Sequence, residues 1–271
     1  MSFLEKLESA SDRNRSRLCV GLDPDPDRLP DHLKGRPNAV TEFTSEIVSA
    51  TQDLACTYKP NFAFFGALGA EGFSILERLI RKIPRDIPVV LDFKAGDIGN
   101  TAERYAAMAY DKLGVDGTTV NPYMGEDAVR PFTAYADRCA FLLCLTSNPG
   151  SADFQRLEVD SAPLYQSVAR KAVGWSQAGA CGLVVGATHP EELGQVRKLA
   201  PELPFLIPGV GSQGGDARAA VEAGANARGG GVIVNASRSI LYASQGANFA
   251  EAARQAAESL RRDLADAQPA A

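Results

Sequence analysis

Histidine is scarce in this sequence, and the cysteines form no recognisable pairs. The 271 residues include two histidines, His32 and His189, neither near a cysteine, and five cysteines without a Cys-x-x-Cys pair. Protein metal sites are commonly built from clustered histidine and cysteine ligands, so this pattern argues against a metal site. An odd number of cysteines, four of them in or beside apolar runs, predicts buried thiols in a reducing, cytoplasmic setting.

Long apolar runs and blocks of basic charge are also missing. No apolar stretch approaches the ~20 residues that a helix needs to span a bilayer. The segment Met1 to Leu18 is charged throughout, unlike an export signal, and Phe3, Leu4 and Leu7 indicate one face of a short helix. The net charge is −5, from 28 basic and 33 acidic residues. We therefore expect neither nucleic acid nor a membrane as partner, although a local positive pocket is compatible with this charge.

What the sequence does contain is an ordinary globular composition. Apolar residues make up 45% and charged residues 23%, which is enough to bury a sizeable core. The length of 271 residues suits one large domain and lies near the ~250 residues typical of an eightfold β/α barrel. We expect a single domain over residues 1–271 with a short helix at its N-terminus.

Short apolar runs alternate with helical patterns along the chain. Such runs predict parallel strands whose sheet is covered on both faces. Eight of them favour a closed (β/α)8 TIM barrel over a Rossmann-like open sheet, since no Gly-x-Gly-x-x-Gly follows the first run. The predicted strands are Leu18–Leu22, Ala55–Tyr58, Pro88–Leu91, Gly117–Val120, Ala140–Leu145, Gly182–Val185, Phe205–Ile207 and Gly231–Val234. The predicted helices are Asn38–Asp53, Gly72–Lys82, Thr101–Lys112, Ala162–Ala178, Glu191–Leu199, Ala217–Ala223 and Asn248–Ala265.

The stretch from Val89 to Thr101 joins an apolar strand to a charged loop. Asp92 and Lys94 stand two residues apart, so their side chains share a face if the strand continues through them. Gly96 breaks the run, and Asp97 beyond it is free to point elsewhere. A carboxylate–ammonium–carboxylate cluster at the end of a strand resembles an active site, while a solvated turn with an incidental ion pair remains the alternative from spacing alone.

Polar residues follow most of the predicted strands. In a β/α barrel the chemistry comes from these C-terminal strand ends, which share one face. The strand-end residues are, in chain order, Asp23, Lys59, Asp92, Lys94, Thr146, Ser147, Asn148, the loop Pro208–Asp216, and Asn235 to Ser239. Two long inserts, Pro24–Pro37 and Ser147–Ser161, are predicted on the same face.

The loops after the seventh and eighth strands have the features of a phosphate site. The segment Pro208–Gly215 is glycine-rich, so its backbone N–H groups can approach an anion. Arg238 offers a charged fork for phosphate oxygens, and the short stretch Ser239–Tyr242 would add helix N-terminal donors. Barrels most often hold phosphate with these two loops. We therefore favour a phosphate site over the alternative, in which the glycines only shape turns and Arg238 is a surface charge.

Together these residues resemble the orotidine 5′-phosphate decarboxylase family. The run Asp92-x-Lys94-x-x-Asp97-Ile98-Gly99-x-Thr101 is similar to the signature of that family, and the resemblance covers nearly the whole chain. The other matching segments are Gly21-Leu22-Asp23, Lys59, Pro208-Gly209-Val210-Gly211 and the Ser-Arg-Ser-Ile run that begins at Ser237. Asn61 and the long loops resemble the bacterial, longer-chain type 2 subgroup.

The resemblance implies decarboxylation of orotidine 5′-phosphate to uridine 5′-phosphate (UMP), the last step of de novo UMP synthesis, without a cofactor or a metal. Lys94 would protonate C6 of the pyrimidine after carbon dioxide has left. Asp92 would lie against the substrate carboxylate, and Asp97 would reach the active site of the other subunit in a homodimer.

The resemblance also implies the substrate contacts. Asp23 and Lys59 would bind ribose hydroxyls, and Ile98 and Thr101 would accompany Asp97 across the subunit interface. The remaining implied contacts are Ser147 with the pyrimidine edge, where the adjacent Thr146 is the alternative, and Gln213 and Arg238 with the 5′-phosphate, next to Pro208.

Elementary chemistry is compatible with this assignment. Loss of carbon dioxide leaves a carbanion without a carbonyl placed to delocalise it, so a fixed cation in a water-poor site must stabilise it. A lysine flanked by carboxylates can serve as both that cation and the proton donor. The alternatives are a magnesium-dependent sugar-phosphate decarboxylase or synthase on the same barrel, a non-catalytic nucleotide-binding protein, and a Schiff-base aldolase, which needs a lysine that loses its proton easily.

Overall fold

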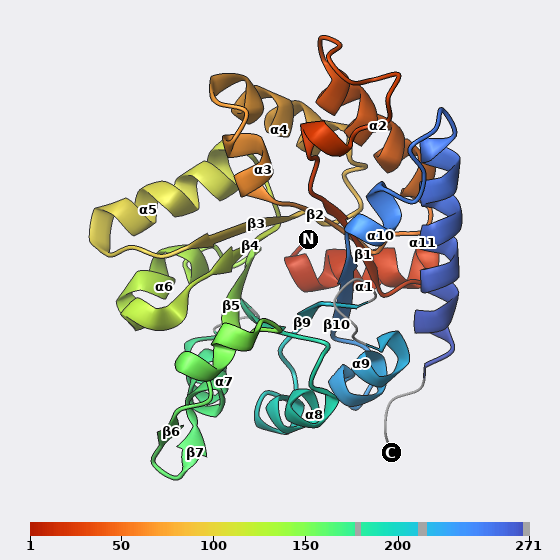
Figure 1. The fold of residues 1–271 in the computed structure, drawn as a ribbon. Coiled ribbons are helices and arrows are strands. Elements are labelled where there is room, and N and C mark those ends of the chain that lie inside the picture. The colour runs from red at the N-terminus through yellow and green to blue at the C-terminus, as the bar shows by residue number, and fades with distance from the viewer. Residues whose placement is uncertain (177–179, 211–215, 268–271) are drawn as a thin grey trace.

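The computed structural model describes residues 1–176, 180–210 and 216–267. In this part of the chain, eight parallel strands form one sheet in the order β2-β1-β10-β9-β8-β5-β4-β3. Two further parallel bridges, Tyr58 to Val89 and Asn61 to Asp92, join β2 to β3 and close the ring. The predicted (β/α)8 barrel is confirmed (Figure 1), and an open sheet is excluded.

The strands and helices alternate as the apolar pattern predicts. The barrel strands are β1 (Leu18–Leu22), β2 (Thr57–Pro60), β3 (Val90–Ala95), β4 (Gly117–Val120), β5 (Cys139–Leu145), β8 (Cys181–Val185), β9 (Phe205–Pro208) and β10 (Val232–Ala236). The α-helices are α1 (Phe3–Asn14), α2 (Ala39–Thr51), α3 (Phe62–Gly66), α4 (Ala70–Lys82), α5 (Gly99–Ala107), α6 (Glu126–Thr133), α7 (Leu164–Trp175), α8 (Pro190–Leu199), α9 (Ala217–Gly224), α10 (Arg238–Leu241) and α11 (Phe249–Ala265). A short hairpin of β6 (Glu158–Val159) and β7 (Ala162–Pro163) projects from the loop after β5.

Four strands, β2, β3, β9 and β10, run further at their C-terminal ends than predicted, and the added residues of β2 and β3 include charged functional candidates. Strand β2 continues through Lys59, and β3 continues through Asp92 and Lys94. Helix α6 was not predicted, because Pro131 lies inside it and proline disfavours the interior of a helix. It forms because Ala128, Val129 and Phe132 are buried against the barrel.

The interior of the barrel is filled from its N-terminal end. Helix α1 closes that end: the Phe3 ring packs edge-on against Phe141 with centroids 5.4 Å apart, and Lys6 forms an ion pair of 2.8 Å with Asp116. Burying an aromatic side chain such as Phe3 contributes roughly 1.5–3 kcal/mol. The apolar cluster continues upward through Val184 and Leu206, so open space is left at the C-terminal ends of the strands.

The helices surround the barrel and bury its outer face. Phe43 and Ile47 of α2, for example, are fully buried in the larger core between strands and helices. Within the described residues, no helix is both long enough and apolar enough to cross a membrane.

Candidate active site

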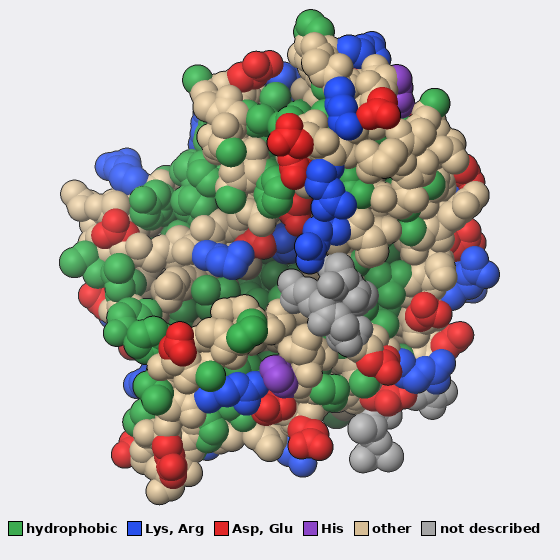
Figure 2. Space-filling view, in the orientation of Figure 1, with side chains coloured by type: hydrophobic (Ala, Val, Ile, Leu, Met, Phe, Trp, Pro, Cys, Tyr) green, Lys and Arg blue, Asp and Glu red, His purple; other side chains and the backbone are tan. Residues whose placement is uncertain are grey.

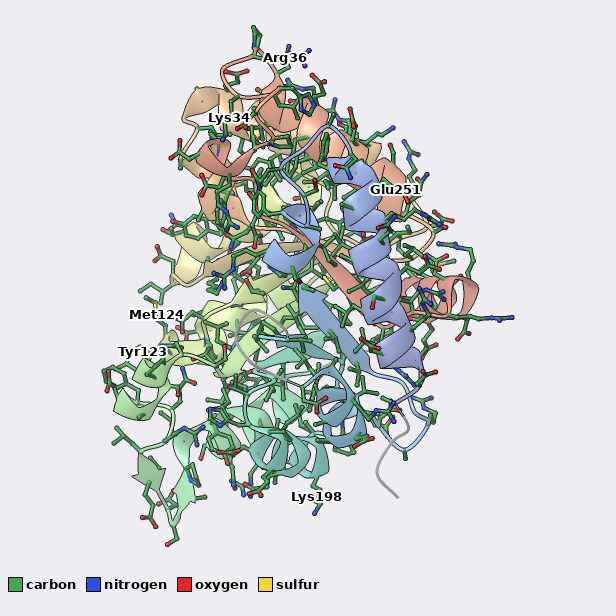
Figure 3. All side chains as sticks on the ribbon, turned by 45° about the vertical axis from the view of Figure 1, so that its right-hand side comes forward. Lys34, Arg36, Tyr123, Met124, Lys198 and Glu251 are labelled. Carbon is green, nitrogen blue, oxygen red and sulfur yellow. The ribbon has the colours of Figure 1, made fainter. Side chains whose placement is uncertain are left out.

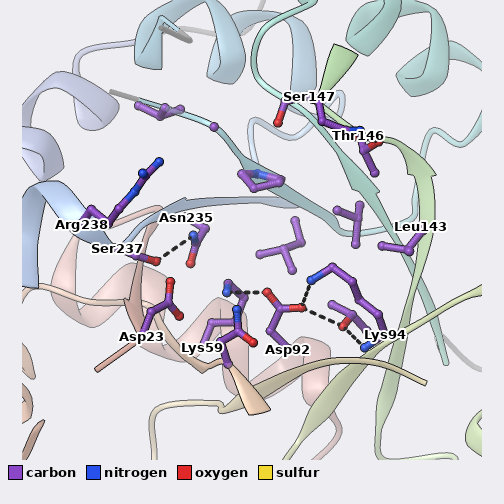
Figure 4. Close-up of a pocket in the computed structure, with 18 residues that line it drawn as sticks. Asp23, Lys59, Asp92, Lys94, Leu143, Thr146, Ser147, Asn235, Ser237 and Arg238 are labelled. Carbon is purple, nitrogen blue, oxygen red and sulfur yellow. Dashed lines mark hydrogen bonds and ion pairs between the residues drawn. The ribbon is translucent and has the colours of Figure 1, made fainter. Parts of the chain in front are cut away.

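A cavity of about 350 Å³ opens at the C-terminal ends of the barrel strands, where the fold predicts a site. Its lining brings together seven of the residues to which the family resemblance assigns a role: Asp23, Lys59, Asp92, Lys94, Ser147, Pro208 and Arg238. In the close-up of Figure 4, Arg238 and Lys94 lie on opposite sides of the pocket, and Asp23, Lys59 and Asp92 lie along the edge between them. A ligand that reached both ends would therefore contact a cation at each.

Asp92 is held between two lysines. Its Oδ2 lies 2.7 Å from Lys59 Nζ and its Oδ1 lies 2.5 Å from Lys94 Nζ. The Lys59 side chain is only 4% exposed and that of Asp92 12%, whereas that of Lys94 is 51% exposed. The buried lysine thus anchors the carboxylate, and the carboxylate in turn directs the exposed ammonium of Lys94 over the cavity.

The electrostatics of this cluster keep the buried pair ionised. Burial by itself raises the pKa of Asp92, but the ammonium groups of Lys59 and Lys94 outweigh burial and hold that pKa well below its usual range. Burial likewise lowers the pKa of Lys59, and the carboxylates of Asp92 and Asp23 more than reverse this and raise it. Both groups therefore carry their charges at neutral pH.

Strand β3 is irregular where it enters the site. Leu91 pairs with Thr118 and Ala95 with Val120, so three residues of β3 face one residue of β4. Within this bulge Lys94 has a φ of 51°, the left-handed conformation that costs a residue with a side chain on the order of 1–3 kcal/mol. Bulges of this kind re-aim side chains beside active sites. Asp92 and Lys94 meet because of this bend and not because they share a regular strand face.

Asp23 and Arg238 reach the other side of the pocket from β1 and β10. The two strands approach closely at Gly21, where a Cβ atom would lie 1.9 Å from Ser237 Oγ, so this position requires glycine. The buried Oδ1 atom of Asp23 has no hydrogen-bond partner among the described residues. An unpaired buried acceptor is costly, and a ligand hydroxyl would satisfy it.

The base of the pocket is apolar, and one wall is polar. Leu143, Val184 and Leu206 line the base, above the filled interior of the barrel. The wall includes Thr146, whose N–H donates to Gln155 Oε1 at 2.7 Å and whose hydroxyl accepts from Gln155 Nε2 at 2.8 Å. Gln155 thereby fixes the loop that carries Ser147, so an apolar base faces a fixed polar edge.

Several lining residues were not predicted from the sequence. Thr119, Leu143, Val184 and Leu206 line the pocket but carry no charge and lie within apolar runs. The signal that could have found Thr119 is its place at the end of the fourth predicted strand. Its neighbour Thr118 is the same type of residue, but successive side chains of a strand point to opposite faces, so Thr118 points away from the pocket.

Three predicted residues do not line this cavity. Asp97, Ile98 and Thr101 lie where β3 leads into α5, and Asp97 Oδ1 accepts a hydrogen bond of 2.8 Å from the Ile98 N–H. Ile98 is 56% exposed. Gln213 lies outside the described residues. Within those residues, no three acidic, histidine or cysteine side chains gather closely enough to hold a metal ion.

The outer face of the site carries both signs of charge. Lys and Arg side chains gather near the middle of the face seen in Figure 2, with Asp and Glu side chains beside them. Basic groups beside an apolar base suit an anionic ligand that has an aromatic or apolar part.

Comparison with known proteins agrees with this geometry. The model of the "Orotidine 5'-phosphate decarboxylase / HUMPS family" matches residues 16–255. The orotidine 5′-phosphate decarboxylase of Azoarcus sp. (strain BH72) is 53% identical over 261 residues, covering 95% of this chain and 96% of that protein. That of Cellvibrio japonicus (strain Ueda107) is 51% identical over 270 residues, covering 97% and 98%.

Solved structures of orotidine 5′-phosphate decarboxylases also resemble this chain. The OMP decarboxylase of Leishmania donovani superposes with a TM-score of 0.85 at 41% identity, over 97% of this chain and 99% of that one. The UMP synthase of Leishmania donovani superposes with a TM-score of 0.89 at 42% identity, over 99% of this chain and 56% of the other. The chain therefore belongs to the orotidine 5′-phosphate decarboxylase family.

Proposed function

We propose that this carboxy-lyase converts orotidine 5′-phosphate to UMP by direct cleavage of the bond between C6 and the carboxylate, with Lys94 as the proton donor. The observation that carries the proposal is the placement of Asp92, whose two oxygens bind the ammonium groups of Lys59 and Lys94. The ammonium of Lys94 is thereby held over the pocket as a fixed cation.

The reaction needs three changes at C6. The bond from C6 to the carboxylate breaks, its electron pair stays on C6, and carbon dioxide leaves. The ammonium of Lys94 stabilises the developing charge and then transfers a proton to C6, which gives UMP and neutral lysine. Asp92, at 2.5 Å from Lys94 Nζ, orients that ammonium and lies next to the position of the substrate carboxylate.

Asp23, Lys59 and Arg238 would hold the parts of the nucleotide that do not react. The unpaired Oδ1 atom of Asp23 suits a ribose hydroxyl, with Lys59 beside it. Arg238 lies across the pocket from Lys94 and would bind the 5′-phosphate, together with Gln213 and the loop at Pro208. Ser147, or the adjacent Thr146, would read the pyrimidine edge. Binding energy from the phosphate can position the ring that reacts.

We further propose a homodimer in which Asp97 and Thr101 complete the site of the partner, with Ile98 beside them. These residues lie outside the pocket of their own subunit. Ile98 is 56% exposed, and in the turn after β4 Tyr123 is 80% and Met124 50% exposed. Figure 3 shows Tyr123 and Met124 at the edge of the molecule. Exposed apolar side chains on two neighbouring loops are typical of a protein interface.

Two finer assignments belong with this proposal. The long loops after β1 and β5 support a place in the bacterial type 2 subgroup. Five buried free cysteines, Cys19, Cys56, Cys139, Cys144 and Cys181, support a reducing compartment, and we place the enzyme in the cytoplasm.

The direct test is to incubate the purified protein with orotidine 5′-phosphate and to follow the pyrimidine absorbance, with and without a chelator. We expect the absorbance change of decarboxylation at the same rate in both samples. The competing candidate, a magnesium-dependent sugar-phosphate decarboxylase or synthase, predicts no change with this nucleotide. A rate that disappears with the chelator and returns with magnesium would contradict a metal-free mechanism.

A further inference from the structure

The hydroxyl of Thr119 lies inside the bulge of β3. It accepts hydrogen bonds of 2.9 Å from the backbone N–H groups of both Phe93 and Lys94, and it donates one of 3.1 Å to Asp92 Oδ1. A hydroxyl has one donor and two acceptor positions, and here all three are used. Thr119 is 2% exposed, so water does not compete for these bonds.

These bonds replace pairing that the bulge removes. Three residues of β3 face Thr119 alone, so the N–H groups of Phe93 and Lys94 are out of register with the backbone of β4. A backbone N–H that is shielded from water and has no partner would be costly. One side-chain oxygen satisfies both groups, and the bulge becomes a stable conformation.

The Thr119 hydroxyl also contacts the ion pair of Asp92 and Lys94. Asp92 Oδ1 accepts from Thr119 Oγ1 and from Lys94 Nζ. Thr119 therefore fixes both ends of the Lys94 residue: its backbone in the left-handed conformation and, through Asp92, its ammonium. On the other side of the bulge the Phe93 ring is held by Phe62 and Tyr105, with centroids 5.0 and 5.3 Å away.

We infer that Thr119 is a positioning residue for decarboxylation, a role that rests on the proposed function of Lys94. It holds the bent segment from Asp92 to Lys94 in the shape that places the ammonium at C6. A displacement of about 1 Å at a reacting group can cost a hundredfold in rate. Loss of this hydroxyl is thus expected to impair the chemical step far more than binding of the nucleotide.

Thr118 provides a matched control in the same strand. Its hydroxyl is also buried and donates to the Leu91 carbonyl oxygen at 2.9 Å, but the side chain points away from the pocket. Replacing Thr118 with valine removes one buried hydroxyl from β4, as the same change at Thr119 does. A purely structural role predicts similar consequences at the two positions.

The test compares Thr119→Val, Thr119→Ser and Thr118→Val, with kcat expressed per UMP-binding site and thermal denaturation recorded for each. We expect Thr119→Val to lower kcat on the order of 100-fold while KM and the Kd for UMP change less than about threefold. Thr119→Ser keeps the hydroxyl and restores most of the rate. Thr118→Val retains a kcat close to that of the wild type. If Thr119→Val does not fold, Thr119→Ala makes the same comparison.

The inference is overturned if Thr119→Val and Thr118→Val have the same kcat, or if a folded Thr119→Ser is as slow as Thr119→Val. A Lys94→Ala variant measured in parallel separates this failure from a failure of the proposed function. An inactive Lys94→Ala beside a fully active Thr119→Val would reject only the positioning role. Normal turnover in Lys94→Ala would reject the proposed function itself.

Discussion

At the residue scale, the ionised side chains of Asp92 and Lys59 make the stability of the fold depend on pH. The pKa of Asp92 is held well below its usual range and that of Lys59 is raised, against the opposing effect of burial on each. The contribution of Asp92 to stability is therefore present above about pH 4 and is lost as the pH falls through its depressed pKa. The contribution of Lys59 is present below about pH 10 and is lost as the pH rises through its raised pKa.

Replacing Asp92 with asparagine should destabilise the fold in a pH-dependent way. The change leaves Lys59 buried without its main counter-charge, which costs about 3–5 kcal/mol of the free energy of unfolding at pH 7. The difference from the wild type should shrink as the pH falls below about 4, where the native carboxylate begins to lose its own advantage. Urea unfolding at several pH values measures both quantities.

Asp86→Asn is the control for this prediction. Asp86 pairs with Arg13 on the surface, where its side chain is 63% exposed, and we expect a change within about 0.5 kcal/mol at every pH. If Asp92→Asn were equally mild, or if its cost did not vary with pH, the buried ion pair would not stabilise the fold.

The residue scale also shows what the sequence could predict about the site. Asp23, Lys59, Asp92 and Lys94 were predicted because charge at the end of an apolar strand is conspicuous. Four other lining residues were not predicted: Thr119, Leu143, Val184 and Leu206. The inner and outer faces of a buried barrel strand are both apolar, so residue type does not show which side chains point inward. Which face a side chain takes depends on strand pairing, which the sequence of one strand does not specify.

At the scale of elements, a tyrosine after α10 joins two loops of the site. The Tyr242 hydroxyl accepts from the Asp25 N–H at 2.7 Å and donates to the Asp23 carbonyl oxygen at 2.9 Å. Its ring stacks on Phe43 and lies under the Arg28 guanidinium, 4.2 Å from the ring centroid. The loop of Asp23 is thus tied to the segment that begins with Arg238.

Tyr242→Phe should loosen this tie while the packing of the ring remains. Loss of two hydrogen bonds to the backbone of the Asp23 loop is expected to raise KM and the Kd for UMP by about 3- to 10-fold. The kcat should stay near that of the wild type, because the Asp92 cluster is untouched. Steady-state kinetics and UMP titration measure the effect. Tyr135→Phe, which removes a hydroxyl bonded to Asp111 on the surface, should change neither constant, and an equal effect of both variants would contradict the tie.

The strands and helices could be predicted where their buried residues recur in the regular spacing of a strand or a helix. The eight strands and most helices follow from apolar runs and their spacing, and β1 and β4 agree with the prediction to the residue. The bulge in β3 was not predictable, because it depends on how β3 pairs with β4. The left-handed φ of Lys94 follows from that bulge and leaves no mark in the local sequence.

At the scale of the whole molecule, the barrel gathers distant residues at one rim and leaves one side of that rim apolar and exposed. Ile98, Tyr123 and Met124 are exposed large apolar side chains on this side. Asp97 lies among the same loops, outside its own pocket. A dimer through this side would account for both observations, and it would divide each active site between two chains.

Mixing two inactive variants tests this division. An equimolar mixture of Lys94→Ala and Asp97→Asn should recover about a quarter of wild-type activity after subunit exchange, because half of the dimers are hybrids with one intact site. Lys94→Ala mixed with Asp92→Asn is the control and should stay inactive, since Asp92 and Lys94 contact each other within one chain. Equal recovery in both mixtures, or none in the first with exchange verified, would contradict a shared site.

The measurement that tests the central claim most directly is decarboxylation of orotidine 5′-phosphate by Lys94→Ala, alongside its affinity for UMP. If Lys94 stabilises the carbanion and protonates C6, this variant should show no measurable turnover and still bind UMP. Lys198→Ala, which removes an exposed lysine of α8 (Figure 3), should be fully active. Turnover of Lys94→Ala near that of the wild type would contradict the mechanism.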